Sequence, residues 1–266
     1  MSAALPIRMV EKPWGRDALP EPFMAPAGQR IGEIWFEPPP QLPQLLVKYL
    51  FTSDKLSVQV HPSDAQLPGH GKEECWLVID AQPGAALGVG FRQAITREAM
   101  RAAALDGSIE QLLEWHAVQV GDFFYIPAGT VHAIGAGVSL IEVQQTSEVT
   151  YRLFDYGRPR ELHLDEGLAV ALGAPHPVGL RRKVPDRGAV TLVDGPLFRL
   201  DRLDGAPDAS ILARYGQAPV LAIPMRGELH VLGERVAPGE CALAETLDDV
   251  GLAPSALCLI AQPCGT

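Results

Sequence analysis

The sequence predicts a mainly β protein of the sandwich or barrel type. Its 26 glycines and 24 prolines interrupt the 266-residue chain often, and the segments between them are short apolar or alternating runs such as KLSVQVHP, CWLVID and DFFYIPAG. Hydrophobic residues make up 47% of the chain, which is enough to bury an ordinary core. These observations favour many short strands.

One segment departs from the β pattern. Residues 96–117, TREAMRAAALDGSIEQLLEWHA, are rich in Ala, Leu, Glu and Arg and predict two short helices separated at DGS. Ser108 is a candidate N-cap for the second helix. We therefore expect a helical insertion near residues 96–117.

A second change in composition divides the chain. Residues 173–189, GAPHPVGLRRKVPDRGA, are dense in Pro, Gly and Arg, as linkers are, and β-type runs resume after them. We expect a catalytic domain at 1–165, a linker at 166–189 and a second β domain at 190–266. Six of the seven histidines precede residue 180, so the chemistry should lie in the first domain.

Composition limits the partners. A net charge of −10 argues against nucleic acid or anionic lipid, which require a basic face. No apolar run has the length of a signal peptide or approaches the roughly 18 residues of a membrane span, so a cytoplasmic protein is expected. The four cysteines lack CxxC spacing, which favours reduced, structural thiols. Oligomeric state, monomer or homodimer, is left open.

Metal-type donors gather in LSVQVHPSDAQLPGHGKEECWLVID, residues 56–80. In a strand, Gln59 and His61 point to one face while Val58 and Val60 point to the other. The next strand begins near EECWLVID, and either Glu73 or Glu74 can reach the same face, because neighbours alternate. Two adjacent strands could thus supply three donors.

A further donor follows in GDFFYIPAGTVHAIGAG, residues 121–137. Gly121, Pro127, Gly129 and His132 have the spacing G-x5-P-x-G-x-x-H, in which the glycines and the proline suit two turns and the histidine opens the next strand. The spacing resembles the second motif of the cupin superfamily, a jelly roll, or double-stranded β-helix, with a metal inside. It departs at Ala136, where cupins often have Asn.

Five blocks together resemble the class I mannose-6-phosphate isomerases of the short bacterial type. They are EKPWG (11–15), LSVQVHP (56–62), GKEECW (71–76), GDFFYIPAGTVHAIGAG (121–137) and EVQQTSEVTYRLFDYGR (142–158). The resemblance implies a cupin jelly roll with a short helical insertion, followed by a degenerate second cupin-like unit. It also implies an isomerase that interconverts mannose 6-phosphate and fructose 6-phosphate through an enediol.

The resemblance also implies one Zn²⁺ per chain. Carried over by motif, its ligands are Gln59, His61, Glu74 and His132. Glu74 is preferred to Glu73 because the family's glutamate lies two residues after the motif lysine. Two histidines, one carboxylate and one amide oxygen form a mixed N/O site, which suits Lewis acid chemistry with an open position.

Catalytic residues are inferred from the same motifs. Arg152 matches the family's arginine, and its permanent charge suits it to stabilise the enediolate. Lys72 and Glu148 are the candidate acid and base. Many relatives have Asp at the position of Glu148.

A sugar phosphate substrate requires local positive charge in an acidic chain. Lys48 and Arg158 are candidate phosphate ligands, with Ser57 as a hydroxyl donor. No nucleotide-binding fingerprint is present, so ATP and NAD are not expected.

Several residues receive structural interpretations. Trp14 is expected in the core, Cys75 and Trp76 behind the ligands, and five histidines on the surface or in loops: His70, His116, His163, His176 and His230. Two other functions are considered. They are an Fe²⁺-dependent cupin oxygenase, which the amide of Gln59 disfavours, and a non-catalytic metal-containing cupin that binds sugar.

Overall fold

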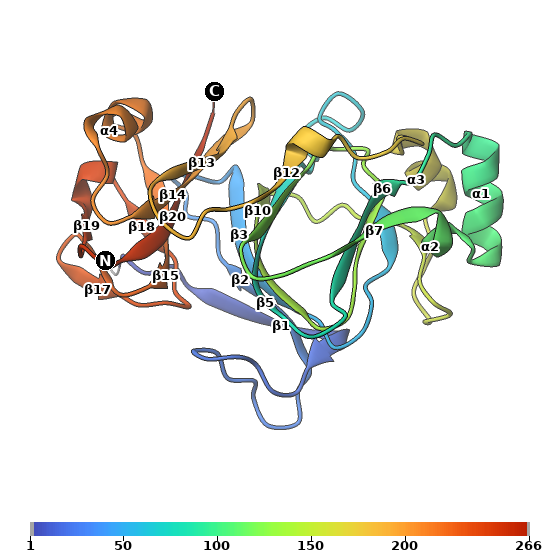
Figure 1. The fold of residues 1–266 in the computed structure, drawn as a ribbon, viewed down its shortest axis with the longest axis horizontal. Coiled ribbons are helices and arrows are strands. Elements are labelled where there is room, and N and C mark those ends of the chain that lie inside the picture. The colour runs from blue at the N-terminus through green and yellow to red at the C-terminus, as the bar shows by residue number, and fades with distance from the viewer. Residues whose placement is uncertain (1–2, 265–266) are drawn as a thin grey trace.

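A computed structural model describes residues 3–264 as a layered β protein (Figure 1). Its strands form four antiparallel sheets and its helices are few, which confirms the mainly β prediction. From one side of the molecule to the other lie three helices, a five-stranded sheet, a seven-stranded sheet, a second five-stranded sheet and a three-stranded sheet.

The seven-stranded sheet is the central layer. In spatial order its strands are β1 (Ile7–Arg16), β2 (Ile31–Phe36), β3 (Leu45–Phe51), β10 (Val138–Gln145), β5 (Glu74–Ala81), β8 (Asp122–Ile126) and β12 (Arg181–Lys183). Because side chains alternate along a strand, Leu50 and Leu140 point into the space before the first five-stranded sheet, whereas Tyr49 and Ile141 face the second β unit.

The facing five-stranded sheet completes the first β unit. Its strands, in order, are β11 (Tyr151–Phe154), β4 (Val58–Val60), β9 (His132–Ile134), β6 (Ala86–Phe91) and β7 (Leu113–Ala117). Leu87 and Ile134 of this sheet pack with Trp76 and Phe124 of the other, so one end of the enclosed space is an apolar core. The opposite end is polar.

Three helices cover the outer face of this sheet. They are α1 (Arg97–Asp106), α2 (Ile109–Leu112) and α3 (Leu164–Val170). Met100 and Leu168 pack with Val58 and Val60, the two valines expected to point away from the donors. None of the helices within residues 3–264 has the length and apolarity to cross a membrane.

The expected pair of helices is confirmed except at its end. Thr96 caps α1 by accepting a hydrogen bond from the Ala99 N–H (3.1 Å). Ser108 precedes α2, but its side chain makes no cap hydrogen bond. Leu113–Ala117 is strand β7 instead of helix, because it pairs with β6 at the edge of the sheet and buries Leu113.

The second β unit contains the other two sheets. The larger has the order β13 (Val190–Asp194), β14 (Phe198–Asp204), β20 (Leu257–Pro263), β15 (Val220–Arg226) and β18 (Ala242–Ala244). The smaller has the order β17 (Glu234–Val236), β16 (Leu229–Val231) and β19 (Val250–Leu252). The unit also has a helix, α4 (Ala209–Tyr215), and a 3-10 turn, η2 (Leu247–Asp249).

The two β units share a continuous hydrophobic core. Tyr49 and Phe51 of the central sheet pack in one cluster with Phe198 and Leu221 of the second unit. Much of the segment expected as a linker has structure of its own: α3 and β12 pack with the first unit, and η1 (Val178–Leu180) lies between them. The division at residues 165 and 190 stays a prediction.

Candidate functional site

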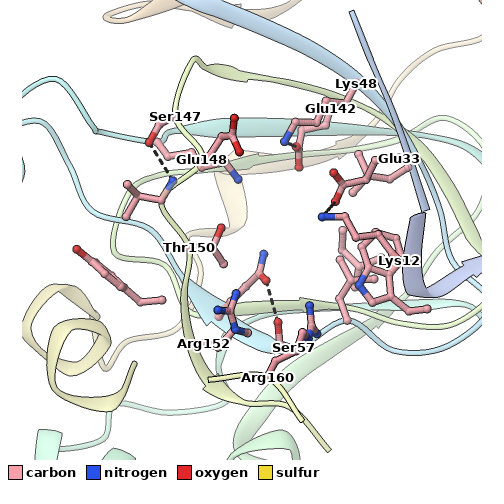
Figure 2. Close-up of a pocket in the computed structure, with 18 of the residues that line it drawn as sticks. Lys12, Glu33, Lys48, Ser57, Glu142, Ser147, Glu148, Thr150, Arg152 and Arg160 are labelled. Atoms are coloured by element: carbon pink, nitrogen blue, oxygen red, sulfur yellow. Dashed lines mark hydrogen bonds and ion pairs between the residues drawn. The ribbon is translucent and has the colours of Figure 1, made fainter. Parts of the chain in front are cut away.

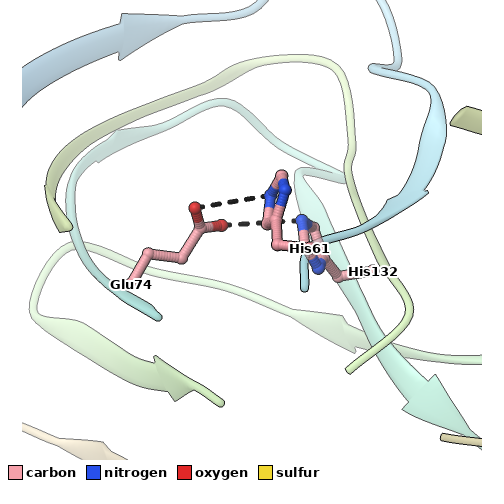
Figure 3. A group of neighbouring side chains, drawn as sticks. All are labelled: His61, Glu74 and His132. Carbon is pink, nitrogen blue, oxygen red and sulfur yellow. Dashed lines mark ion pairs between the residues drawn. The ribbon is translucent and has the colours of Figure 1, made fainter. Parts of the chain in front are cut away.

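A buried group of three metal-type donors lies at the polar end of the first unit (Figure 3). His61 follows β4, Glu74 opens β5 and His132 opens β9, and their ligand atoms all lie within 4.8 Å of one another. Glu74 Oε2 is 3.5 Å from His61 Nε2, and Glu74 Oε1 is 3.5 Å from His132 Nε2. The carboxylate therefore bridges the two imidazoles, as Figure 3 shows.

Local backbone structure explains how these residues meet. β4 pairs with β9 at a single register position, which places Gln59 opposite His132. Gly121 and Gly129 adopt φ values of 88° and 82°, a region that side chains disfavour, so the turns before His132 need glycine. Glu73 points away from the site, where its carboxylate accepts a hydrogen bond from the Tyr125 hydroxyl.

Both histidines are oriented by their second ring nitrogen. His61 Nδ1 is 2.9 Å from the carbonyl oxygen of Val149, and His132 Nδ1 is 2.9 Å from that of Thr130. A carbonyl only accepts, so each Nδ1 carries the proton and each Nε2 keeps the lone pair with which an imidazole binds a metal. Burial lowers the pKa of both imidazoles, which favours the neutral form that binds metals.

The donor set fits a metal ion. Glu74 Oε1 is buried and has no hydrogen-bond partner among residues 3–264, although a buried carboxylate oxygen normally has one. The ammonium of Lys72 lies 2.5 Å from Glu74 Oε2 and 3.1 Å from His61 Nε2. Burial alone would lower the pKa of Lys72, but Glu74 and Glu142 raise it, so the donors are already held around a positive charge.

Gln59 lies beside the three donors. Its Nε2 is 3.3 Å from His132 Nε2, and its Oε1 accepts a hydrogen bond of 3.0 Å from the Ser57 hydroxyl. A half-turn of the amide exchanges these two atoms, which places the oxygen toward His132 and leaves an N–H for Ser57. Gln59 can thus act as a fourth, oxygen ligand.

A pocket of about 430 Å³ opens next to the donors (Figure 2). On one side, Lys48 forms an ion pair with Glu142 (3.2 Å), which also accepts a hydrogen bond from Trp76 Nε1 (2.9 Å). Arg152, Arg160 and Ser57 lie on the opposite side, as Figure 2 shows. The pocket therefore has charged groups on both walls.

Most of the candidate catalytic and substrate residues line this pocket. Those that do are Lys48, Ser57, Lys72, Glu148 and Arg152. Arg158 is not among the lining residues, because ion pairs with Asp54 (2.6 Å) and Asp155 (3.2 Å) hold its guanidinium elsewhere. Glu148 lies at the rim, where its side chain is 72% exposed and 3.7 Å from Arg8.

Sequence reasoning missed other pocket residues: Lys12, Glu33, Trp35, Glu142, Arg160 and His163. A signal for Glu142 was present, since it is the one charged residue of the strand VSLIEVQQ and alternation places it on the same face as Gln144. Trp14 was expected in the core and is buried there, and it also lines the pocket.

His163 and His176 lie in loops, as expected, but each makes contacts that the sequence did not indicate. His163 lines the pocket. His176 is 5% exposed because it packs over Gly90, and its Nε2 donates to the carbonyl of Tyr125 (2.8 Å).

Burial of His176 predicts a pH-dependent stability. Burial lowers the pKa of His176, the hydrogen bond to the Tyr125 carbonyl raises it, and the charge of Arg181 lowers it, with a net lowering. Below about pH 6.5 the unfolded chain therefore takes up a proton that the folded chain does not. The free energy of unfolding should therefore fall as the pH drops from 7.5 to 5.5, with this residue adding at most about 1.4 kcal/mol per pH unit.

Urea unfolding at several pH values measures this dependence. His176→Gln keeps a donor for Tyr125 without a titrating ring, and its stability should fall less steeply than that of the parent chain. The exposed His230, changed to Gln, is the control and should leave the slope unchanged. Equal slopes for the parent and His176→Gln would contradict the assignment.

The sequence is related to mannose-6-phosphate isomerases. No family model matches the chain. The mannose-6-phosphate isomerase ManA of Bacillus subtilis is 37% identical over 211 residues, which cover 73% of this chain and 65% of the relative. Across the relatives that it matches, the chain covers 45% to 65% of their length.

Solved structures show the same fold. The crystal structure of the mannose 6-phosphate isomerase from Bacillus subtilis matches with a TM-score of 0.77 and 23% identity, over 97% of this chain and 98% of that chain. A zinc-bound mannose 6-phosphate isomerase matches with a TM-score of 0.72 and 15% identity, over 98% of this chain and 99% of that chain.

Proposed function

The chain belongs to the class I mannose-6-phosphate isomerase family, and we propose that it interconverts mannose 6-phosphate and fructose 6-phosphate. The buried group of His61, Glu74 and His132 beside a cation-lined pocket is the observation that carries this proposal.

Zn²⁺ is the metal that we propose for the site. His61, Glu74 and His132 would hold it, with Gln59 as the fourth ligand after its amide turns. Bound there, zinc would supply a Lewis acid for the sugar oxygens. Nitrogen and oxygen donors without thiolate are typical of catalytic zinc sites.

The charge of the pocket suits a sugar phosphate. Three lysines that line or reach it are paired with carboxylates: Lys12 with Glu33 (3.4 Å), Lys48 with Glu142 (3.2 Å) and Lys72 with Glu74 (2.5 Å). These pairs cancel, so Arg152, which forms no salt bridge within residues 3–264, and a divalent metal leave a surplus of positive charge for a phosphate dianion. Lys48 and Ser57 can add hydrogen bonds to the substrate.

Proton transfer between C1 and C2 needs groups beside the metal ligands. Lys72 contacts two of the ligands, His61 and Glu74. Glu142 is buried between Lys48 and Trp76, on the wall of the pocket opposite Arg152. We assign these two residues to the proton, and Arg152 to the developing charge of the enediolate. Glu148, which is largely exposed at the rim, is a weaker candidate for the base than Glu142.

A coupled assay tests the proposal. Mannose 6-phosphate added to the zinc-loaded chain should yield fructose 6-phosphate, and the activity should disappear with a chelator and return with Zn²⁺. A zinc-loaded, folded chain without turnover would reject the isomerase and leave a sugar-binding cupin. Oxygen uptake with Fe²⁺ in place of turnover would favour the oxygenase.

A further inference from the structure

Arg152 and Arg160 place two positive charges on one wall of the pocket (Figure 2). Within residues 3–264 Arg152 forms no salt bridge; its Nε donates to the carbonyl of Glu161 (2.9 Å). Burial lowers the pKa of Arg152, and the nearby charge of Arg160 lowers it further. Two like charges at close range are stabilised by an anion between or beside them.

Arg160 is held in place from behind. Asp155 is 2% exposed and accepts hydrogen bonds from Nε and Nη2 of Arg160, each of 2.6 Å. Asp155 does not line the pocket, so it fixes the guanidinium without bringing a carboxylate to the ligand. Because Asp155 binds Nε and Nη2, the Nη1 group of Arg160 stays available to a ligand, and the side chain is ordered before a ligand binds.

The position of Arg160 sets it apart from the metal ligands. Across the sheet, His132 pairs with Gln59 and Gln59 with Arg152. The segment 160–163 then runs along the far side of β11, where His163 N donates to the carbonyl of Arg152 (2.8 Å). In this order the backbone of His163 lies three strand spacings of about 4.8 Å from that of His132, which places the segment that carries Arg160 away from the metal ligands.

We propose that Arg160, positioned by Asp155, anchors the phosphate of the sugar phosphate at the end of the pocket opposite the metal ligands. Arg152, the neighbour of Gln59, then lies nearer the reacting carbons. This inference rests on the proposed function and adds the residue that recognises the phosphate. It assigns to Arg160 the role that the sequence had suggested for Arg158.

Arg158 offers a matched control. It is also an arginine paired with Asp155, but its Nη2 is bound to Asp54 (2.6 Å) and to the carbonyl of Lys55 (2.8 Å), outside the pocket. Changing either arginine to Met removes one partner of Asp155. A change in folding caused by the loss of a partner of Asp155 should therefore appear in both variants. A change in phosphate binding should appear in Arg160→Met alone.

The experiment uses the zinc-loaded chain and its variants Arg160→Met, Arg160→Lys and Arg158→Met. Arg160→Met should raise the KM for mannose 6-phosphate and the Kd for inorganic phosphate, measured by calorimetry, by about tenfold to a hundredfold, with a much smaller change in kcat. Arg160→Lys, which keeps the positive charge near Asp155, should have KM and Kd values between those of the parent chain and of Arg160→Met. Metal content should stay the same.

The proposal is overturned if Arg160→Met binds inorganic phosphate as the parent does, or if Arg158→Met weakens binding equally. Its failure is distinct from that of the proposed reaction. Phosphate binding that depends on Arg160 in a chain without turnover would support the anchor and reject the isomerase. Turnover with an unchanged KM in Arg160→Met would do the reverse.

Discussion

His132→Ala should leave the chain without bound zinc and lower its isomerase activity by roughly a thousandfold or more. His132 supplies one of only three donors in the buried group, its Nε2 is 3.5 Å from Glu74 Oε1, and its ring is fixed by the carbonyl of Thr130. With the imidazole gone, Glu74 and one histidine remain beside the neutral amide of Gln59, a weaker set than the two histidines and one carboxylate of a catalytic zinc site. Metal analysis after gel filtration and the coupled assay give the two readouts.

Two further variants guard this result against misfolding. His132 is fully buried, so its truncation also leaves a cavity; His132→Leu fills more of that space without supplying a donor and should still lack zinc. His70 is exposed in the loop between His61 and Glu74, and His70→Ala should keep both the bound metal and the isomerase rate. Full zinc content in a folded His132→Ala chain would mean that the metal is bound elsewhere.

Arg152→Ala should retain zinc and lose activity by about 100-fold to 1,000-fold, mainly in kcat. The guanidinium lines the pocket one strand away from Gln59 and pairs with no carboxylate among the described residues, so its charge is available to the substrate. Loss of one such donor from a preorganised site removes stabilisation that exists chiefly in the transition state. Single-turnover rates at saturating substrate measure the effect.

The control for Arg152 is another arginine near the pocket. Arg8 stacks on the outer face of Trp35 (4.2 Å) and pairs with Glu37, without lining the pocket itself. Arg8→Ala should therefore change kcat little. A fully active Arg152→Ala chain would remove this residue from the catalytic set, and an inactive chain that has also lost zinc would make its role structural.

Alternation along strands predicted the site's first half correctly. Val58 and Val60 face the helices while Gln59 and His61 point to the metal donors, because successive side chains of a strand leave on opposite faces whatever the rest of the fold. The same rule required one of Glu73 and Glu74 to point in, and the structure brings Glu74 to the histidines. Alternation left the choice between the two glutamates open, and only the resemblance to the family motif selected Glu74.

Long-range pairing decided what local patterns could not. Residues 113–117 continue a helical composition, yet they form β7 because the edge of β6 was available to them. Glu142 belongs to the pocket because β10 lies between β3 and β5, which places it beside Lys48 and Trp76. Arg158 and Arg160 both pair with Asp155, but Asp54 and the carbonyl of Lys55 hold Arg158 outside the pocket, a difference that only the contacts across the fold create.

The sequence by itself determined the β class, the helical insertion up to residue 112 and the shared face of Gln59 and His61, since these follow from spacing along short segments, while the choice of Glu74 came from the resemblance to the family motif. The tertiary structure decided which charges share the pocket with those donors. Lys48 is 94 residues from Glu142 in the sequence, and Arg152 and Arg160 lie on the opposite side of the pocket from both, so only the pairing of the sheets fixes their neighbours and their burial. That is a property of contacts across the fold, which no single stretch of sequence contains.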